Sequence, residues 1–172
     1  ARRAVPHNIE APDAEGVAAR ELVGSEAYDL NVQQFCCEGL NFGYFYEKSP
    51  IISHETEPAP AYTMGSFTPS TIPGCRAPHF WRQDGTSLYD ALGNGYSLLR
   101  FDSQIDVQEL LKLAKSSNMP LNLIDLEDET HKPAAYEHPL VLCRTDQHVV
   151  WRGHELPDSL PKFMSFLLGQ PA

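Results

Sequence analysis

The strongest constraint on the fold of this chain is a run of prolines in its first half. Five of the 14 prolines lie within residues 57–78. Proline fixes its own φ and has no amide hydrogen to donate, so this segment cannot form a regular helix or strand. Its apolar side chains, such as Tyr62 and Phe67, need cover from water. The pattern therefore predicts an extended arm that lies on a surface of this chain or of a partner.

The residues before this arm carry weaker structural signals. An alanine-rich stretch at residues 15–23 predicts a short helix, and the aromatic-rich residues 42–46 (FGYFY) predict a strand. We therefore divide the chain into two parts. Residues 1–78 are expected to hold an N-terminal lead-in, the aromatic strand and the arm, and residues 79–172 are expected to form a domain.

Residues 79–172 show the periodic patterns of a folded domain. From Val107 to Ala114, apolar residues recur at the spacing of one buried helix face. Asp158 precedes another apolar helical stretch and is its expected N-cap. The predicted elements are, in order, a helix at 87–92, a strand at 96–101, a helix beginning near Asp102 or Ser103, a strand at 121–126, a short helical connection at 131–137, strands at 140–144 and 148–152, and a helix from about 159.

This order of elements predicts an α/β fold. The first strand, helix and strand favour a parallel pair joined by a right-handed crossover, and the last two strands favour an antiparallel hairpin. The succession is typical of a thioredoxin-like mixed sheet flanked by helices, here preceded by the extended proline-rich arm. In such folds a cis-proline often precedes the third strand, so the bond between His138 and Pro139 is expected to be cis.

The composition narrows the classes of function. Lys and Arg number 13 and Asp and Glu 23, which gives a formal charge of -10. Such a chain lacks the basic surface that nucleic acids require. It also has no apolar run near the ~20 residues that cross a bilayer and no secretory signal pattern. The four cysteines form no C-x-x-C motif, and reduced thiols fit a cytoplasmic protein best.

Several stretches resemble one protein family. They are residues 73–81 (PGCRAPHFW), residues 98–101 (LLRF) and residues 140–153 (LVLCRTDQHVVWRG), and residues 44–52 (YFYEKSPII) are similar to the segment that leads into them. All resemble the C-terminal region of FAD-dependent aromatic-ring hydroxylases, the phenol-hydroxylase-like flavin monooxygenases. The resemblance spans about residues 40–155 and implies a thioredoxin-like closing domain without redox function.

The sequence departs from a whole enzyme of that family in its glycines. The family holds the FAD pyrophosphate with a G-x-G-x-x-G loop that opens a helix. Here the only G-x-G is at residues 93–95, Leu98 stands at the third glycine position, and a strand follows. We therefore expect no cofactor site in this chain, with FAD and NAD(P)H acting only in a flavin-bearing part outside it. The expected helix start at 102–105 also lacks a thioredoxin cysteine.

The candidate site residues are few. His79 can serve as an acid or base near neutral pH, and Arg76 brings a positive charge close to it, although both also suit packing of the arm onto the domain. No histidine stands in a zinc-binding pattern, so no metal site is expected. The candidates for an aromatic substrate pocket are Tyr44, Tyr46, Tyr62 and Trp81.

Two functions remain open from the sequence. The chain is either a structural and assembly module of a flavin aromatic hydroxylase, or a stand-alone cofactor-free cyclase, isomerase or binding protein for an aromatic or polyketide-like compound. The first predicts an apolar surface at residues 42–46 that self-associates or meets a flavin-binding partner. The second predicts a closed pocket in which titratable side chains converge on an aromatic small molecule.

Overall fold

A four-stranded mixed sheet organises the protein, whose computed structural model describes residues 5–170. The strands are β1 (Tyr96–Arg100), β2 (Leu121–Asp125), β3 (Leu140–Cys143) and β4 (Val149–Gly153), in the order β2-β1-β3-β4. β1 and β2 run parallel, and β3 runs antiparallel to both β1 and β4. The expected parallel pair and the expected hairpin are both confirmed.

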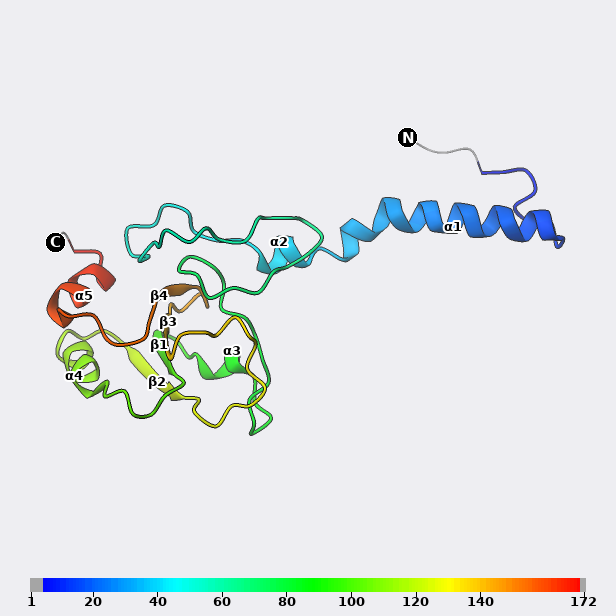
Figure 1. Ribbon diagram of the computed structural model, residues 1–172. Helices are drawn as coiled ribbons and strands as arrows, with labels where there is room; N and C mark the ends of the chain where they lie inside the picture. The colour runs from blue at the N-terminus through cyan, green and yellow to red at the C-terminus, as the bar shows by residue number, and fades with distance from the viewer. Residues whose placement is uncertain (1–4, 171–172) are drawn as a thin grey trace.

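Helices cover both faces of this sheet (Figure 1). α4 (Gln108–Ser116) connects β1 to β2, and α5 (Leu160–Leu167) follows β4. Both pack on one face, where Leu98 and Leu142 lie in a core with their apolar side chains. The short α3 (Leu88–Ala91) packs on the other face, against Leu99 and Val141. Successive strand residues therefore enter opposite cores, as the two-residue period of a strand requires.

Several predicted boundaries in this region are wrong. α4 begins six residues after Asp102, because residues 102–107 form turns and the Asp106 carboxylate accepts the Gln108 amide at 2.9 Å. Residues 131–137 form turns instead of a helix. Ser159, not Asp158, is the N-cap of α5 and makes no side-chain capping bond. The peptide bond before Pro139 is trans, since the described chain has no cis bond.

The N-terminal residues differ most from expectation. α1 (Ala14–Phe35) extends far beyond residue 23 and projects away from the sheet (Figure 1). Its first turn is capped by Asp13, whose carboxylate accepts the Gly16 amide at 2.8 Å. The prediction of a strand at residues 42–46 is wrong, because its first residue belongs to α2 (Glu38–Phe42). Within residues 42–46, only Phe45 forms a β-bridge, with Cys75, and a single bridge does not make a strand.

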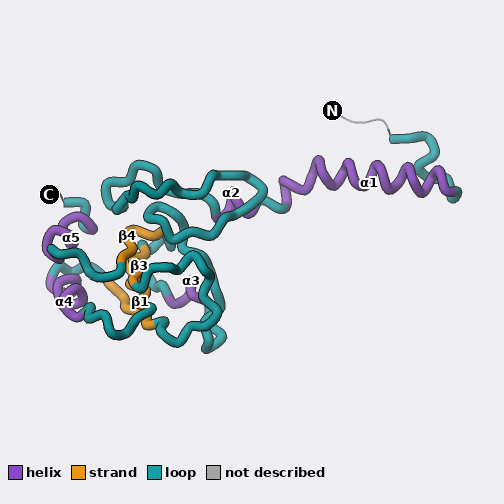
Figure 2. The backbone as a smooth tube through the Cα atoms, viewed as in Figure 1, coloured by secondary structure: helices purple, strands orange, loops and turns teal. Residues whose placement is uncertain are grey.

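Residues 57–78 hold no helix or strand (Figure 2). This segment and the residues before it run along the outer edge of β4. Ser53 donates its amide to the Val150 carbonyl at 2.9 Å, and Gly74 donates to Val149 at 2.8 Å. The contacts cover an edge strand that would otherwise present unpaired backbone groups. Among residues 5–170, no helix is long and apolar enough to cross a membrane.

Candidate functional site

Two of the candidate residues, Arg76 and His79, pack against Tyr89 at the start of α3, and a third, Trp81, packs against His79. The guanidinium of Arg76 lies 5.1 Å from the centre of the Tyr89 ring, and the His79 ring lies edge-on to it at 5.0 Å. Trp81 contacts the other side of His79 at 5.2 Å and is largely exposed. The Nε2 atom of His79 lies 2.9 Å from the Ser87 hydroxyl, which also accepts the Tyr89 amide as the α3 cap. Of this cluster, Arg76 also lines a small hollow beside Tyr62.

Two further candidates, Tyr44 and Tyr46, pack on the turn between β3 and β4. The Tyr46 hydroxyl donates to the Asp146 carboxylate at 2.8 Å. This hydrogen bond, followed by burial and the charge of Asp146, raises the pKa of Tyr46. The buried His148 ring lies edge-on to Tyr46 at 4.8 Å and to Tyr44 at 6.2 Å. Aromatic pairs in this geometry stabilise packing.

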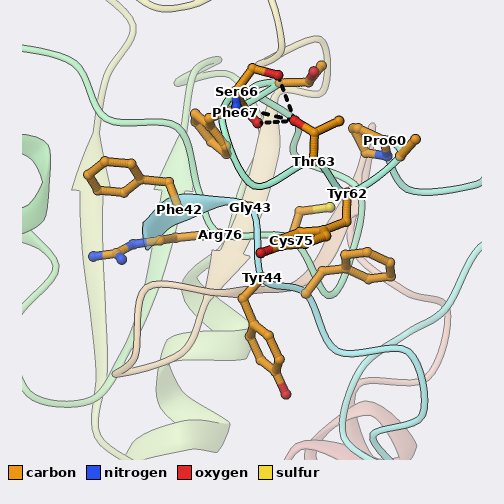
Figure 3. Close-up of a pocket in the computed structure, with 13 residues that line it drawn as sticks. Phe42, Gly43, Tyr44, Pro60, Tyr62, Thr63, Ser66, Phe67, Cys75 and Arg76 are labelled. Carbon is orange, nitrogen blue, oxygen red and sulfur yellow. Dashed lines mark hydrogen bonds between the residues drawn. The ribbon is translucent and has the colours of Figure 1, made fainter. Parts of the chain in front are cut away.

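Tyr62 lies at a separate hollow between α2 and the loop at residues 60–68 (Figure 3). The hollow has a volume of about 20 Å³, which is room for about one water molecule. Thr63 and Ser66 close one end through a hydrogen bond between their hydroxyls at 2.7 Å. An open depression of about 450 Å³ adjoins it, lined by Tyr44, Phe45 and Tyr62 among others. Tyr44 and Arg76 also line the hollow beside Tyr62, whereas Tyr46 and Trp81 do not, so the predicted aromatic pocket is only partly assembled in one place.

Arg152 forms a second set of polar contacts, on β4. Its guanidinium pairs with Glu55 at 2.7 Å and with Glu57 at 2.6 Å. It also donates to the Thr71 hydroxyl at 3.3 Å. The carboxylates, with the side-chain hydrogen bond to Glu55 as the main cause, raise the pKa of Arg152. A planar guanidinium suits such forked pairing, which fastens both ends of the proline-rich segment to the sheet.

The two buried thiols, Cys75 and Cys143, are unsuited to redox catalysis. All four cysteines are unpaired, and Cys75 and Cys143 are buried. Burial raises the pKa of Cys75, and it raises that of Cys143 to about 12. Both are therefore protonated at neutral pH, whereas nucleophilic cysteines need a lowered pKa. Among residues 5–170, no three or more His, Cys, Asp or Glu side chains gather as a metal site.

Sequence reasoning missed the residues that organise these contacts. They are Tyr89, Asp146 and Arg152, none of which was a candidate. A signal for two of them was present, because the hairpin stretch 144–153 holds six polar or charged side chains within an otherwise buried pair of strands. Polar side chains in such a place need partners from another segment. The partners here come from residues 41–57 and 71–77, which no local pattern could have indicated.

Known proteins match the chain over most of its length. A family described as "Aromatic-ring hydroxylase, C-terminal" matches residues 70–171. The FAD-dependent monooxygenase apdD of Emericella nidulans is 29% identical over 157 residues, which cover 86% of this chain and 24% of that protein. A phenol 2-monooxygenase of Pseudomonas sp. is 24% identical over 157 residues, which cover 81% of this chain and 25% of that protein.

A solved structure extends the likeness to α1. The substrate-free form of the rebeccamycin biosynthetic enzyme REBC matches with a TM-score of 0.73 and 29% identity, over 99% of this chain and 31% of that one. The chain thus spans about a quarter to a third of the proteins it matches, and their FAD-binding part lies outside it. Because the family match covers more than half of the sequence, the chain belongs to the aromatic-ring hydroxylase C-terminal family.

Proposed function

With membership of that family as the premise, we propose that the chain is a non-redox, thioredoxin-like C-terminal module with a structural and assembly role in an FAD-dependent aromatic monooxygenase. Hydroxylation, with FAD, NAD(P)H and oxygen, belongs in this proposal to a flavin-bearing part outside the chain. The observation that carries it is the use of the candidate side chains. Arg76, His79 and Tyr46 all make packing or hydrogen-bonding contacts within the protein, and of the three only Arg76 lines the small hollow beside Tyr62.

The sheet supports the thioredoxin-like part of this proposal. Its order β2-β1-β3-β4, with the parallel pair crossed by α4 and the final hairpin followed by α5, is the arrangement expected for that fold. The redox site of a thioredoxin lies where the first strand leads into its helix. Here residues 101–107 fill that position and include no cysteine.

The exposed apolar side chains support the assembly role. Soluble proteins rarely leave many large apolar residues uncovered near one another. In this proposal the flavin-bearing part covers these residues, and a second copy of the chain is the rival occupant. The residues concerned, on α1, α2 and the segments around them, are Val17, Leu22, Tyr28, Leu30, Phe35, Leu40, Tyr44, Tyr62 and Met64.

The stand-alone enzyme is less well supported. A cyclase or isomerase would need a pocket of several hundred cubic ångströms that buries most of an aromatic substrate. The enclosed hollow beside Tyr62 has about 20 Å³. The larger depressions are open to solvent, and the lining of the one at Tyr44 and Tyr62 includes one carboxylate, Glu47, and no histidine, lysine or arginine.

The test combines the chain with the flavin-bearing part of a monooxygenase that matches it, followed by gel filtration and flavin absorbance. We expect the chain alone to carry no flavin and to co-elute with the flavin-bearing part. The double variant Leu30→Asp/Phe35→Asp should abolish co-elution, because charges would replace two of the exposed apolar side chains. The control is Leu168→Asp, which changes an exposed leucine after α5, on the opposite side of the protein. Stoichiometric FAD on the chain alone, or equal effects of the two variants, would contradict the proposal.

A further inference from the structure

The turn between β3 and β4 contains a residue in an unfavourable backbone conformation. Gln147 has a φ of 68°, in the left-handed region where a side chain costs free energy and glycine is preferred. Such strain persists where surrounding contacts maintain it, and it often marks a functional position. Here the contacts come from outside the hairpin. The Gln147 carbonyl accepts the Ala77 amide at 2.8 Å, and its side-chain oxygen accepts a hydrogen bond from Arg76.

Neighbouring turn residues also bind a distant segment. Asp146 accepts the Tyr46 hydroxyl at 2.8 Å, and the Arg144 guanidinium lies 5.1 Å from the centre of the Tyr46 ring. The His148 ring packs edge-on against Tyr46. Within the turn, Asp146 also pairs with Arg144 at 3.3 Å, which holds its carboxylate toward Tyr46. Three contacts, from Arg144, Asp146 and His148, thus join this turn to Tyr46.

Arg76 connects the turn to α2. Besides its bond to Gln147, it donates to the Asn41 carbonyl at 3.3 Å and lies 5.3 Å from the centre of the Phe42 ring. Gly74 allows the close approach on the other side, since a side-chain carbon there would lie 2.7 Å from the Tyr46 carbonyl oxygen. The segment 41–46 is therefore fastened at both of its ends.

We propose that residues 144–148 form an anchor turn, whose polar side chains fix segment 41–46 and so set the place and direction in which α2 and α1 leave the sheet. This role gives a structural reason for the polar side chains of residues 144–148. It rests on contacts within the chain, so it can hold or fail independently of the proposed assembly with a flavin-bearing part.

The test is hydrogen exchange on the full chain with Gln147→Gly. If Gln147 only closes the turn, replacing it with glycine relieves the backbone strain. Every amide should then exchange at the wild-type rate or more slowly. If the turn is an anchor, losing the acceptor for Arg76 should speed exchange at the Gly43 and Tyr46 amides about tenfold, the effect of one hydrogen bond to a charged group. Tyr46→Phe, which removes only the hydroxyl bonded to Asp146, should have the same effect. The Leu99 amide in β1 should not change in either variant.

The matched control is Asp84→Asn in the other tight turn. Asp84 accepts the Thr86 amide at 2.9 Å and pairs with Arg82, much as Asp146 does with His148 and Arg144, but it has no contact with segment 41–46. We expect no change at the Gly43 and Tyr46 amides in this variant. Unchanged exchange there in both Gln147→Gly and Tyr46→Phe would overturn the anchor, as would an equal increase in Asp84→Asn.

Discussion

The sheet-containing body at residues 79–170 and the N-terminal region at residues 5–47 are stabilised in different ways. In the body, Leu142 is fully buried, as are the other inward-facing residues of β3. In the N-terminal region, Leu30 is 74% exposed and Phe35 is 81% exposed. Burial of apolar surface is the main source of folding free energy. The body therefore carries its own stability, whereas α1 is a helix whose apolar residues have no cover within the described chain.

The intervening segment at residues 48–78 belongs with the body, although it has no regular structure. Its backbone bonds to the edge of β4, and Arg152 joins Glu55, Glu57 and Thr71 to that strand. Irregular segments can be as well fixed as helices when their polar groups have partners. Secondary structure alone thus does not separate the stable part of this protein from the exposed part.

The largest test of the comparison uses two leucines. Leu142→Ala should lower the free energy of unfolding by about 3 kcal/mol, because it leaves a cavity in a close-packed core. Leu30→Ala should change it by less than about 0.5 kcal/mol, as exposed substitutions do. Urea unfolding followed by tryptophan fluorescence measures both. If the two variants lose similar stability, and the loss at Leu30 depends on protein concentration, then a second copy covers α1 and the comparison fails.

A smaller effect is expected at the contact that holds the proline-rich segment. Arg152→Met should cost about 2 kcal/mol, since it removes a nearly buried guanidinium, leaves Glu55 without its partner and leaves the Thr71 hydroxyl with only its bond to the Ala135 carbonyl. The same variant should speed proteolysis within residues 55–71. Arg20→Met is the matched control, because Arg20 donates two 2.8 Å hydrogen bonds but is exposed on α1. Equal losses from the two arginines would show that the segment is not part of the body.

The body could be predicted from sequence because its signals are local. The short buried runs of β1 and β3 and the helical spacing from Val107 to Ala114 each depend on residues a few positions apart. The errors occurred where a distant contact decides the structure. Residues 42–46 have the composition of a strand, yet the hydroxyl of Tyr46 bonds to Asp146, a hundred positions away. α4 begins later than predicted because residues 102–107 form turns, in which two aspartates accept hydrogen bonds from nearby amides.

The candidate site was less predictable than the fold, for the same reason. His79 and Arg76 were correctly seen as near neighbours of an aromatic surface, and both do contact the Tyr89 ring. Their chemistry, however, depends on what lies opposite them, and that comes from residues far along the chain. The role of Arg152 could not be read from β4 alone, since an arginine in a strand normally faces water.

The smallest expected effect is on the pH dependence of stability, and it tests the surroundings of His138, which include Arg152. Burial, then the nearby charges of Arg152 and His154, lower the pKa of His138, while Glu55 and Glu137 oppose this shift. The unfolded chain therefore binds a proton at His138 more readily than the folded one, so stability should fall as pH drops below about 6.5. His138→Asn should remove a fraction of a kcal/mol of that loss between pH 8 and pH 5, measured by urea unfolding at each pH. His131→Asn, at an exposed histidine, is the matched control. A wild-type slope that His138→Asn does not reduce would mean that burial and the charges beside His138 do not lower its pKa in the folded chain.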